Sequence, residues 1–144
     1  MFNRERFKSI VAEKDNMSWA DHEDDYKMSK LWREMIDLIV NSDENFNDFL
    51  EYMRDEMTEN EYGYLSEISD EISQEKPSYE FIEEYKALAK KYPQATKDYQ
   101  IQDFIEVAEG FVELKLGPKD NWRFVKKDVM KYFWSIFKRI DIKR

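Results

Sequence analysis

The chain offers few side chains that could carry out catalysis or bind a metal. It has no cysteine and a single histidine, His22. Without cysteine there can be no thiolate nucleophile, zinc ribbon or iron–sulfur cluster, and one histidine cannot build a histidine metal site or readily complete a catalytic triad. His22 stands in the acidic run 21–25 (Asp-His-Glu-Asp-Asp), which has no recognised ligand spacing. We therefore interpret this run as a solvated acidic turn.

Carboxylates are the most abundant polar groups, with 32 Asp and Glu against 23 Lys and Arg and a net charge of −9. Two suitably placed carboxylates can catalyse the hydrolysis of a glycoside. Because the chain has so many acidic residues, almost any pair could be chosen, so no particular pair indicates such an active site. A di-iron bundle needs two Glu-x-x-His motifs, and the sequence has none. Three glycines are too few for a phosphate-binding loop or a dinucleotide fingerprint. We predict a protein that is not an enzyme and that uses no cofactor or metal.

The charges are distributed unevenly along the chain. Residues 1–114 hold 13 basic and 29 acidic side chains, whereas residues 115–144 hold 10 basic and 3 acidic ones. The densest acidic stretch, 42–75, has 12 acidic residues and one basic residue, Arg54. Like charges one turn apart cost a helix about 0.2–0.5 kcal/mol per pair, so this pattern works against helix stability. Either it is a solvated face that maintains solubility, or it is a surface for a basic partner.

The acidic residues fall on the faces of two consecutive predicted helices. On a helical wheel, the acids of the first helix that are listed below lie within about 60° of one another, opposite the apolar side of that helix. The listed acids of the second helix lie opposite its apolar side. We expect two tyrosines, Tyr52 and Tyr64, to be exposed beside these faces, where they could anchor a partner. The predicted partner-binding residues are Glu44, Asp48, Glu51, Tyr52, Asp55, Tyr64, Glu67, Asp70 and Glu71.

The C-terminal segment has the opposite character. Its basic side chains lie away from Phe133 and Ile140 on the last predicted helix: Arg123, Lys127, Lys131 and Lys138. This segment could neutralise the acidic body, within one chain or between subunits, or it could contact a membrane surface or a nucleic acid. We favour neutralisation, because an acidic body repels polyanions. We therefore expect no direct nucleic-acid binding.

Apolar residues recur every three or four positions along most of the chain. This period predicts an all-α fold, a single helical domain over residues 1–144 with about seven short helices. The helices are predicted at about residues 2–14, 26–40, 43–57, 58–75, 78–92, 98–114 and 122–140. Pro93 is expected to close the fifth helix, and Gly117-Pro118 to form a turn. Residues 111–116 alternate as Phe-Val-Glu-Leu-Lys-Leu, so a small C-terminal β-hairpin with residues 122–124 is an alternative.

No segment is predicted to enter a membrane. None approaches the roughly 18 apolar residues that span a bilayer, and the first eight residues, Met-Phe-Asn-Arg-Glu-Arg-Phe-Lys, lack the apolar stretch of a signal peptide. We expect a cytoplasmic protein that is a monomer or a small homo-oligomer.

The central sequence resembles small helical bacterial immunity proteins, the cytoplasmic antidotes of contact-dependent inhibition and other polymorphic toxin systems. The resemblance spans about residues 43–112 and rests on residues 64–78 (YLSEISDEISQEKPS), 80–93 (EFIEEYKALAKKYP) and 104–110 (FIEVAEG). Many toxins of these systems are nucleases with a basic cleft. The resemblance implies an immunity protein that occludes such a cognate toxin domain stoichiometrically through its acidic surface. The alternative is a helical adaptor or regulatory protein unrelated to toxins, which would bind its partner through an apolar groove.

Overall fold

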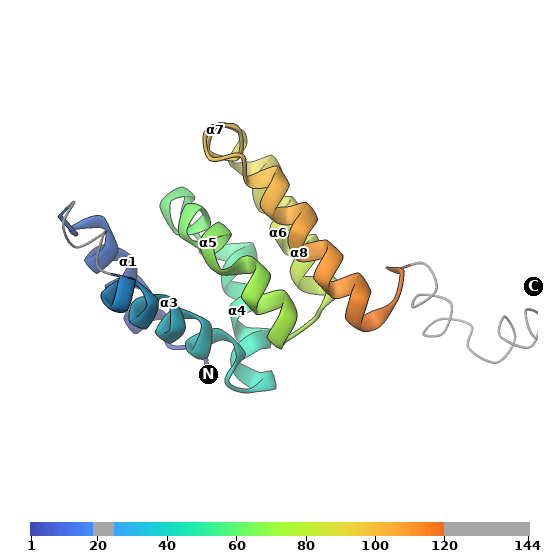
Figure 1. The fold of residues 1–144 in the computed structure, drawn as a ribbon, viewed down its shortest axis with the longest axis horizontal. Coiled ribbons are helices and arrows are strands. Elements are labelled where there is room, and N and C mark those ends of the chain that lie inside the picture. The colour runs from blue at the N-terminus through green and yellow to red at the C-terminus, as the bar shows by residue number, and fades with distance from the viewer. Residues whose placement is uncertain (19–24, 120–144) are drawn as a thin grey trace, which may run out of the picture.

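The structure is a computed structural model that describes residues 1–18 and 25–119. These residues form helices and no strand, which confirms the predicted all-α fold (Figure 1). The helices are α1 (Arg4–Asp15), α3 (Asp25–Val40), α4 (Asp43–Asp55), α5 (Glu59–Glu75), α6 (Tyr79–Lys91), α7 (Pro93–Asp98) and α8 (Ile101–Leu116).

Helix α5 lies at the centre of the fold and contacts helices on both of its sides. It packs against α1 and α3 on one side and against α7 and α8 on the other (Figure 1). Its apolar stripe is fully buried, with Tyr62, Leu65 and Ile72 each 0% exposed. Helix α4 packs against α3 and α6. The core of the described residues is therefore one cluster to which every helix contributes.

Three helices begin at caps that the sequence signals directly. The side chains of Ser42 and Ser78 accept hydrogen bonds from the backbone N–H groups three residues later, at the starts of α4 and α6. Thr58 and Glu61 form a reciprocal capping box at the start of α5. These three boundaries agree with the predictions, because each cap depends only on residues within one turn.

The predicted end of the fifth helix is confirmed, since α6 ends at Lys91, just before Pro93. The sequence did not predict that Pro93 also opens the short helix α7, at the first position, where the missing proline N–H costs no hydrogen bond.

The alternative of a C-terminal hairpin is wrong. Residues 111–116 are helical and belong to α8, so they form no strand. In this segment the helical spacing of apolar residues decides the structure over the alternating pattern, because Val112 continues the buried face formed by Ile105 and Ala108. The predicted helix 122–140 and the hairpin partner 122–124 lie outside the described residues.

Candidate protein-binding surface

The acidic residues of α4 differ in what they contact. Glu51 and Asp55 are exposed, and Glu44 is exposed with its carboxylate 3.4 Å from the N-terminal amino group. Asp48 is different: it accepts two hydrogen bonds from the Arg4 guanidinium, at 2.8 and 3.1 Å, and a third from the Phe2 N–H at 3.0 Å. These donors hold the pKa of Asp48 below its usual value. Asp48 therefore fastens the N-terminal residues onto α4.

Tyr52 is not an exposed anchor, so that prediction is wrong. Its side chain is 0% exposed, and its ring packs edge-on against Phe2 and Phe7. The hydroxyl donates a hydrogen bond of 2.7 Å to Glu61, and burial raises the pKa of Tyr52 to about 12. Position 52 lies at the edge of the apolar side of α4, and α1 covers that edge. A helical wheel of α4 alone cannot show that a residue is buried by another helix.

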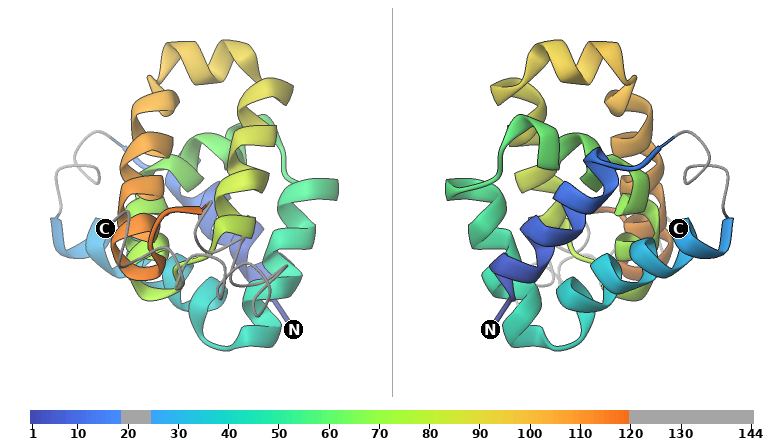
Figure 2. Two further views of the ribbon diagram at one scale, coloured as in Figure 1. Left: turned by 90° about the vertical axis from the view of Figure 1, so that its right-hand side faces the viewer. Right: turned by 90° about the vertical axis from the view of Figure 1, so that its left-hand side faces the viewer.

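Helix α1 also covers part of the acidic face of α5. Glu67 accepts hydrogen bonds from Lys14 Nζ at 2.9 Å and from the Trp32 indole at 2.7 Å. The Tyr64 hydroxyl donates to Asp15 at 2.6 Å. The right-hand view of Figure 2 shows α1 crossing in front of α5, with the start of α1 beside α4. The basic side chains of α1 therefore neutralise acids of both helices.

The two predicted acidic faces are not one continuous stripe. Asp48 pairs with Arg4 in the first turn of α1, whereas Glu67 pairs with Lys14 in its last turn. Ten residues of helix separate these two contacts by about 15 Å. The structure thus places Asp48 of α4 and Glu67 of α5 at opposite ends of α1.

Asp70 and Glu71 lie half-buried on α5, beyond the reach of α1. Glu71 Oε2 is buried and has no hydrogen-bond partner in the described part of the chain. Burial, together with the neighbouring Asp70 carboxylate, raises the pKa of Glu71 to about 7. Glu71 is therefore a predicted site residue whose pKa is shifted into the neutral range.

A hollow of about 680 Å³ lies between α5, α7 and the start of α8. Two predicted partner-binding residues, Tyr64 and Glu67, line it. Tyr99 and Phe104 also line it and remain 63% and 43% exposed. Among the residues that the structure describes, the charged lining residues are all acidic, with no Lys or Arg: Glu59, Glu67 and Asp98. The hollow combines negative charge with accessible aromatic rings.

Sequence reasoning missed this hollow because it missed α7. The short helix turns the chain so that the Tyr99 ring lies beside Gly63 of α5, where a Cβ would be in ordinary van der Waals contact with the ring, at 3.8 Å. The sequence does carry a signal, since Pro93 is a residue type that favours a helix start. The succession of Asp98, Tyr99 and Phe104 then supplies the acid and the aromatic rings.

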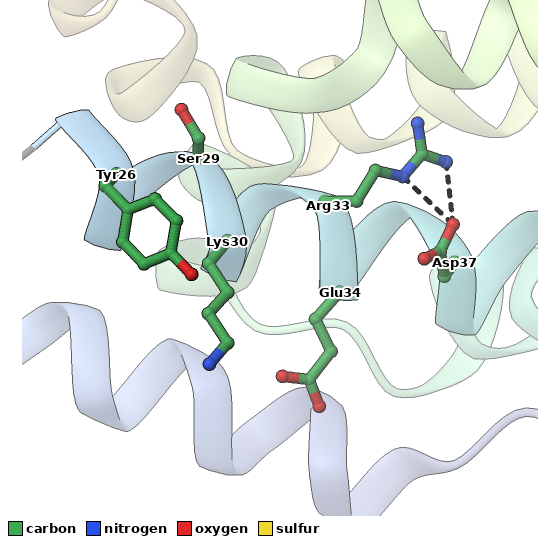
Figure 3. A pocket seen from close by; sticks show the side chains of 6 residues that line it. All are labelled: Tyr26, Ser29, Lys30, Arg33, Glu34 and Asp37. Carbon is green, nitrogen blue, oxygen red and sulfur yellow. Dashed lines mark hydrogen bonds and ion pairs between the residues drawn. The ribbon is translucent and has the colours of Figure 1, made fainter.

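A second hollow, of about 530 Å³, lies along the outer face of α3 (Figure 3). Its lining residue Arg33 pairs with Asp37 at 2.7 Å and with Glu75 at 2.9 Å, and Glu34 pairs with Arg6 of α1. Figure 3 shows Tyr26, Lys30 and Glu34 on the side toward α1. Charges of both signs are present and the Arg33 and Glu34 groups are satisfied, so this face has no marked preference for a charged partner.

The described residues show no metal site and no membrane-spanning helix. Within 1–18 and 25–119, no three His, Asp or Glu side chains are grouped so that they could hold a metal ion. None of the helices formed by those residues is both long and apolar enough to cross a bilayer. Residues 21–24 of the acidic run around His22 lie outside the described part, and Asp25 opens α3. Comparison with protein-family models, curated proteins and solved structures finds no match to this chain.

Proposed function

We propose that this chain is an immunity protein that binds a cognate basic nuclease toxin domain and neutralises it by stoichiometric occlusion. The observation that carries the proposal is the hollow between α5, α7 and α8. Its charged lining is wholly acidic, and two of its aromatic side chains, Tyr99 and Phe104, are exposed. Such a lining suits the Lys and Arg side chains with which a nuclease binds phosphates.

The chemistry of the hollow fits a basic side chain in two ways. A guanidinium can stack on the accessible ring of Tyr99, which contributes about 0.5–2 kcal/mol depending on how much water is excluded. The carboxylates of Glu59 and Asp98 can accept its N–H groups in charge-assisted hydrogen bonds. An occupied hollow would hold the basic residues of the partner away from nucleic acid, so no catalytic step is required of this chain.

The exposed acids of α4 would contribute mainly to the rate of association. Glu51 and Asp55 are exposed, and the nearby cation, Arg54, is already bound by Glu84 at 2.8 Å. Exposed charges of one sign attract an oppositely charged partner over a Debye length of about 8–10 Å. These residues are therefore suited to steering a basic domain toward the chain.

The test combines partner capture with matched variants. The tagged chain is used to capture partners from its native cells at low and moderate salt, and the captured domain is assayed as a nuclease with increasing amounts of the chain. We expect one basic domain that is released as salt rises and is inhibited fully at a ratio of about 1:1. The variant Glu59→Gln/Asp98→Asn should weaken binding about tenfold or more. Glu80→Gln, an exposed acid of α6, is the control and should leave binding unchanged.

Two results would contradict the proposal. One is capture of a partner that is not basic or whose activity the chain does not inhibit. The other is equal binding by the double variant and the control, which would place the contact elsewhere. A helical adaptor is the second candidate, since α8 exposes Val107 and Leu114. An adaptor would bind through apolar residues, and its affinity would depend little on salt.

A further inference from the structure

Helix α8 has an apolar side that no described helix covers. Phe104 is 43% exposed, Val107 is 50% exposed and Leu114 is 81% exposed. Together with the half-buried Phe111 they are spaced by three, four and three positions, so they lie within about 80° on one side of the helix. We call these four residues the outer strip of α8. The strip extends about 15 Å from Phe104 to Leu114.

The outer strip lies on the side of α8 that faces away from α6. On the α6 side, Glu109 pairs with Lys86 of α6 at 2.9 Å. Glu109 is two positions from both Val107 and Phe111, and two positions turn a helix by about 200°. The strip therefore points away from α6.

The end of α8 is held on the α6 flank. The Tyr79 hydroxyl of α6 donates a hydrogen bond to the Gly117 carbonyl. Lys119 pairs with Glu83, which also belongs to α6. These contacts hold the turn after α8 away from the outer strip.

The outer strip is continuous with the hollow between α5, α7 and α8. Phe104 belongs to both, since it is the first residue of the strip and lines the hollow together with Tyr99. The acids Glu59 and Asp98 line the hollow at this end. Asp103 is exposed one turn before Val107, near the same end of the strip. The combined surface therefore has an acidic, aromatic end and an apolar length.

A helix suits this surface better than an extended segment does. The backbone N–H and C=O groups along α8 are hydrogen-bonded within the helix, so they cannot pair with a strand. Only side chains can make the contact, and a helix presents its apolar side chains at positions i, i+3, i+4 and i+7. A helix of about ten residues matches the length of the outer strip. Lys or Arg at one end of such a helix would complement the acids of the hollow.

We propose that the outer strip and the hollow together bind one amphipathic helix of the partner. Its apolar side chains pack on α8, and its Lys or Arg side chains enter the hollow at one end. The inference deepens the proposed function and rests on it for the basic character of the partner. It divides the affinity into two parts: salt weakens the contribution of the hollow, whereas it has little effect on that of the outer strip.

A library of random peptides tests this surface without the natural partner. Phage-displayed peptides of about 16 residues, long enough for a helix over both parts of the surface, are selected on the full chain. We expect enriched peptides to have apolar residues at steps of three and four and Lys or Arg at one end. Their affinity for the chain and its variants is then measured by fluorescence anisotropy at two salt concentrations.

One pair of variants locates the apolar part of the contact. Val107→Gln/Leu114→Gln should weaken binding of the enriched peptides about tenfold or more at both salt concentrations, because the peptide would bury these exposed side chains. Glu106→Gln/Glu113→Gln creates the same residues at exposed positions of α8 outside the strip. This control should change binding about twofold at most.

A second variant locates the basic end of the peptide. Glu59→Gln/Asp98→Asn should weaken binding about tenfold at low salt and much less at high salt, because it removes only the charges of the hollow. The different salt dependence of this variant and Val107→Gln/Leu114→Gln would support one helix that contacts both parts of the surface.

Three results would overturn the inference. The first is a selection that enriches no peptide with the basic and apolar pattern, which is also the result expected if another part of the same chain occupies the strip. The second is equal binding of the enriched peptides by Val107→Gln/Leu114→Gln and its control. The third is a dimer in sedimentation that Val107→Gln/Leu114→Gln dissociates, which would assign the strip to a second copy.

Failure of this inference can be distinguished from failure of the proposed function. Suppose that the chain inhibits a captured basic nuclease, and that Val107→Gln/Leu114→Gln binds the nuclease as tightly as the unsubstituted chain does. This result would overturn the inference alone. Peptides that bind as expected, together with a captured partner whose activity the chain does not inhibit, would overturn the proposed function alone.

Discussion

Lys14 Nζ of α1 lies 2.9 Å from Glu67 Oε1 of α5, and this contact joins the two helices at a buried cation. The Lys14 side chain is 1% exposed, and its ammonium lies over the rings of Trp32 and Tyr64 at 4.9 and 5.0 Å. Burial lowers the pKa of Lys14, and Glu67 partly offsets this effect. Trp32 of α3 donates to the same carboxylate oxygen, so Glu67 connects three helices.

The first prediction is that Glu67→Gln lowers the free energy of unfolding by about 2 kcal/mol. The substitution leaves the buried Lys14 ammonium without its counter-charge, which costs less than at a fully buried site because Glu67 is partly exposed. Urea unfolding at neutral pH measures the loss. The control is Glu59→Gln, an exposed acid of the same helix, which should stay within about 0.5 kcal/mol of the unsubstituted chain. Equal stability of the two variants would show that the Lys14 contact does not support the fold.

The second prediction concerns Tyr52, whose hydroxyl donates to Glu61 inside the protein. Tyr52→Phe should lower the free energy of unfolding by about 1.5 kcal/mol, because a hydrogen bond to a charged group is lost while the packing of the ring is retained. Tyr64→Phe should cost less, about 0.5 kcal/mol, since its partner Asp15 is exposed. Thermal and urea unfolding compare the two. A larger loss for Tyr64→Phe would contradict the burial of Tyr52.

The third prediction separates two acids of α4 that look equivalent in the sequence. Asp48→Asn should lower the free energy of unfolding by about 1–2 kcal/mol, because it weakens the hydrogen bonds from Arg4 and Phe2. Glu51→Gln should change stability by less than about 0.5 kcal/mol, since Glu51 is exposed. Urea unfolding of both variants checks this. A similar loss in both variants would contradict the contact between Asp48 and the N-terminal residues.

The difference between Asp48 and Glu51 shows how far sequence reasoning reaches in this protein. The helix starts at Ser42, Thr58 and Ser78 could be predicted because a cap is a contact between residues within one turn. The apolar periods of the long helices likewise predict which side of each is buried. Helix α7 was not predicted, because its six residues are too few to show the helical period of apolar residues.

The candidate site depends on contacts between helices, and these are far apart in the sequence. Arg4 reaches Asp48, and Lys14 reaches Glu67, over separations of 44 and 53 residues. A helical wheel describes one helix at a time, so it counted Asp48, Tyr52 and Glu67 as parts of an open surface. Only the position of α1 shows that Tyr52 is buried and that the two acids are paired.

The fourth prediction is that the exposed acids of α4 act on association more than on stability. Glu51→Lys/Asp55→Lys should slow association with a basic partner about tenfold at low salt and flatten the dependence of the rate on salt. Stopped-flow mixing or surface plasmon resonance at two salt concentrations measures both effects. Unfolding in urea serves as the control and should change little, because both side chains are exposed. An unchanged association rate would exclude this face from the path of the partner.

The fifth prediction follows from Glu71, whose pKa is raised from 4.5 to about 7 by burial and by Asp70. Between these two pH values the folded chain holds a proton at Glu71 that the unfolded chain has released. The contribution of Glu71 to stability therefore falls as the pH rises from 4.5 to 7. Glu71→Gln imitates the protonated acid and removes this loss.

Glu71→Gln should accordingly be more stable than the unsubstituted chain at pH 8, by about 1 kcal/mol because the side chain is only half-buried, and nearly equal to it at pH 4.5. Urea unfolding at the two pH values gives both differences. Glu80→Gln, at an exposed position of α6, is the control and should show no such change between the two pH values. The same stability difference at pH 4.5 and pH 8 would show that the substitution acts through packing and not through the charge of Glu71.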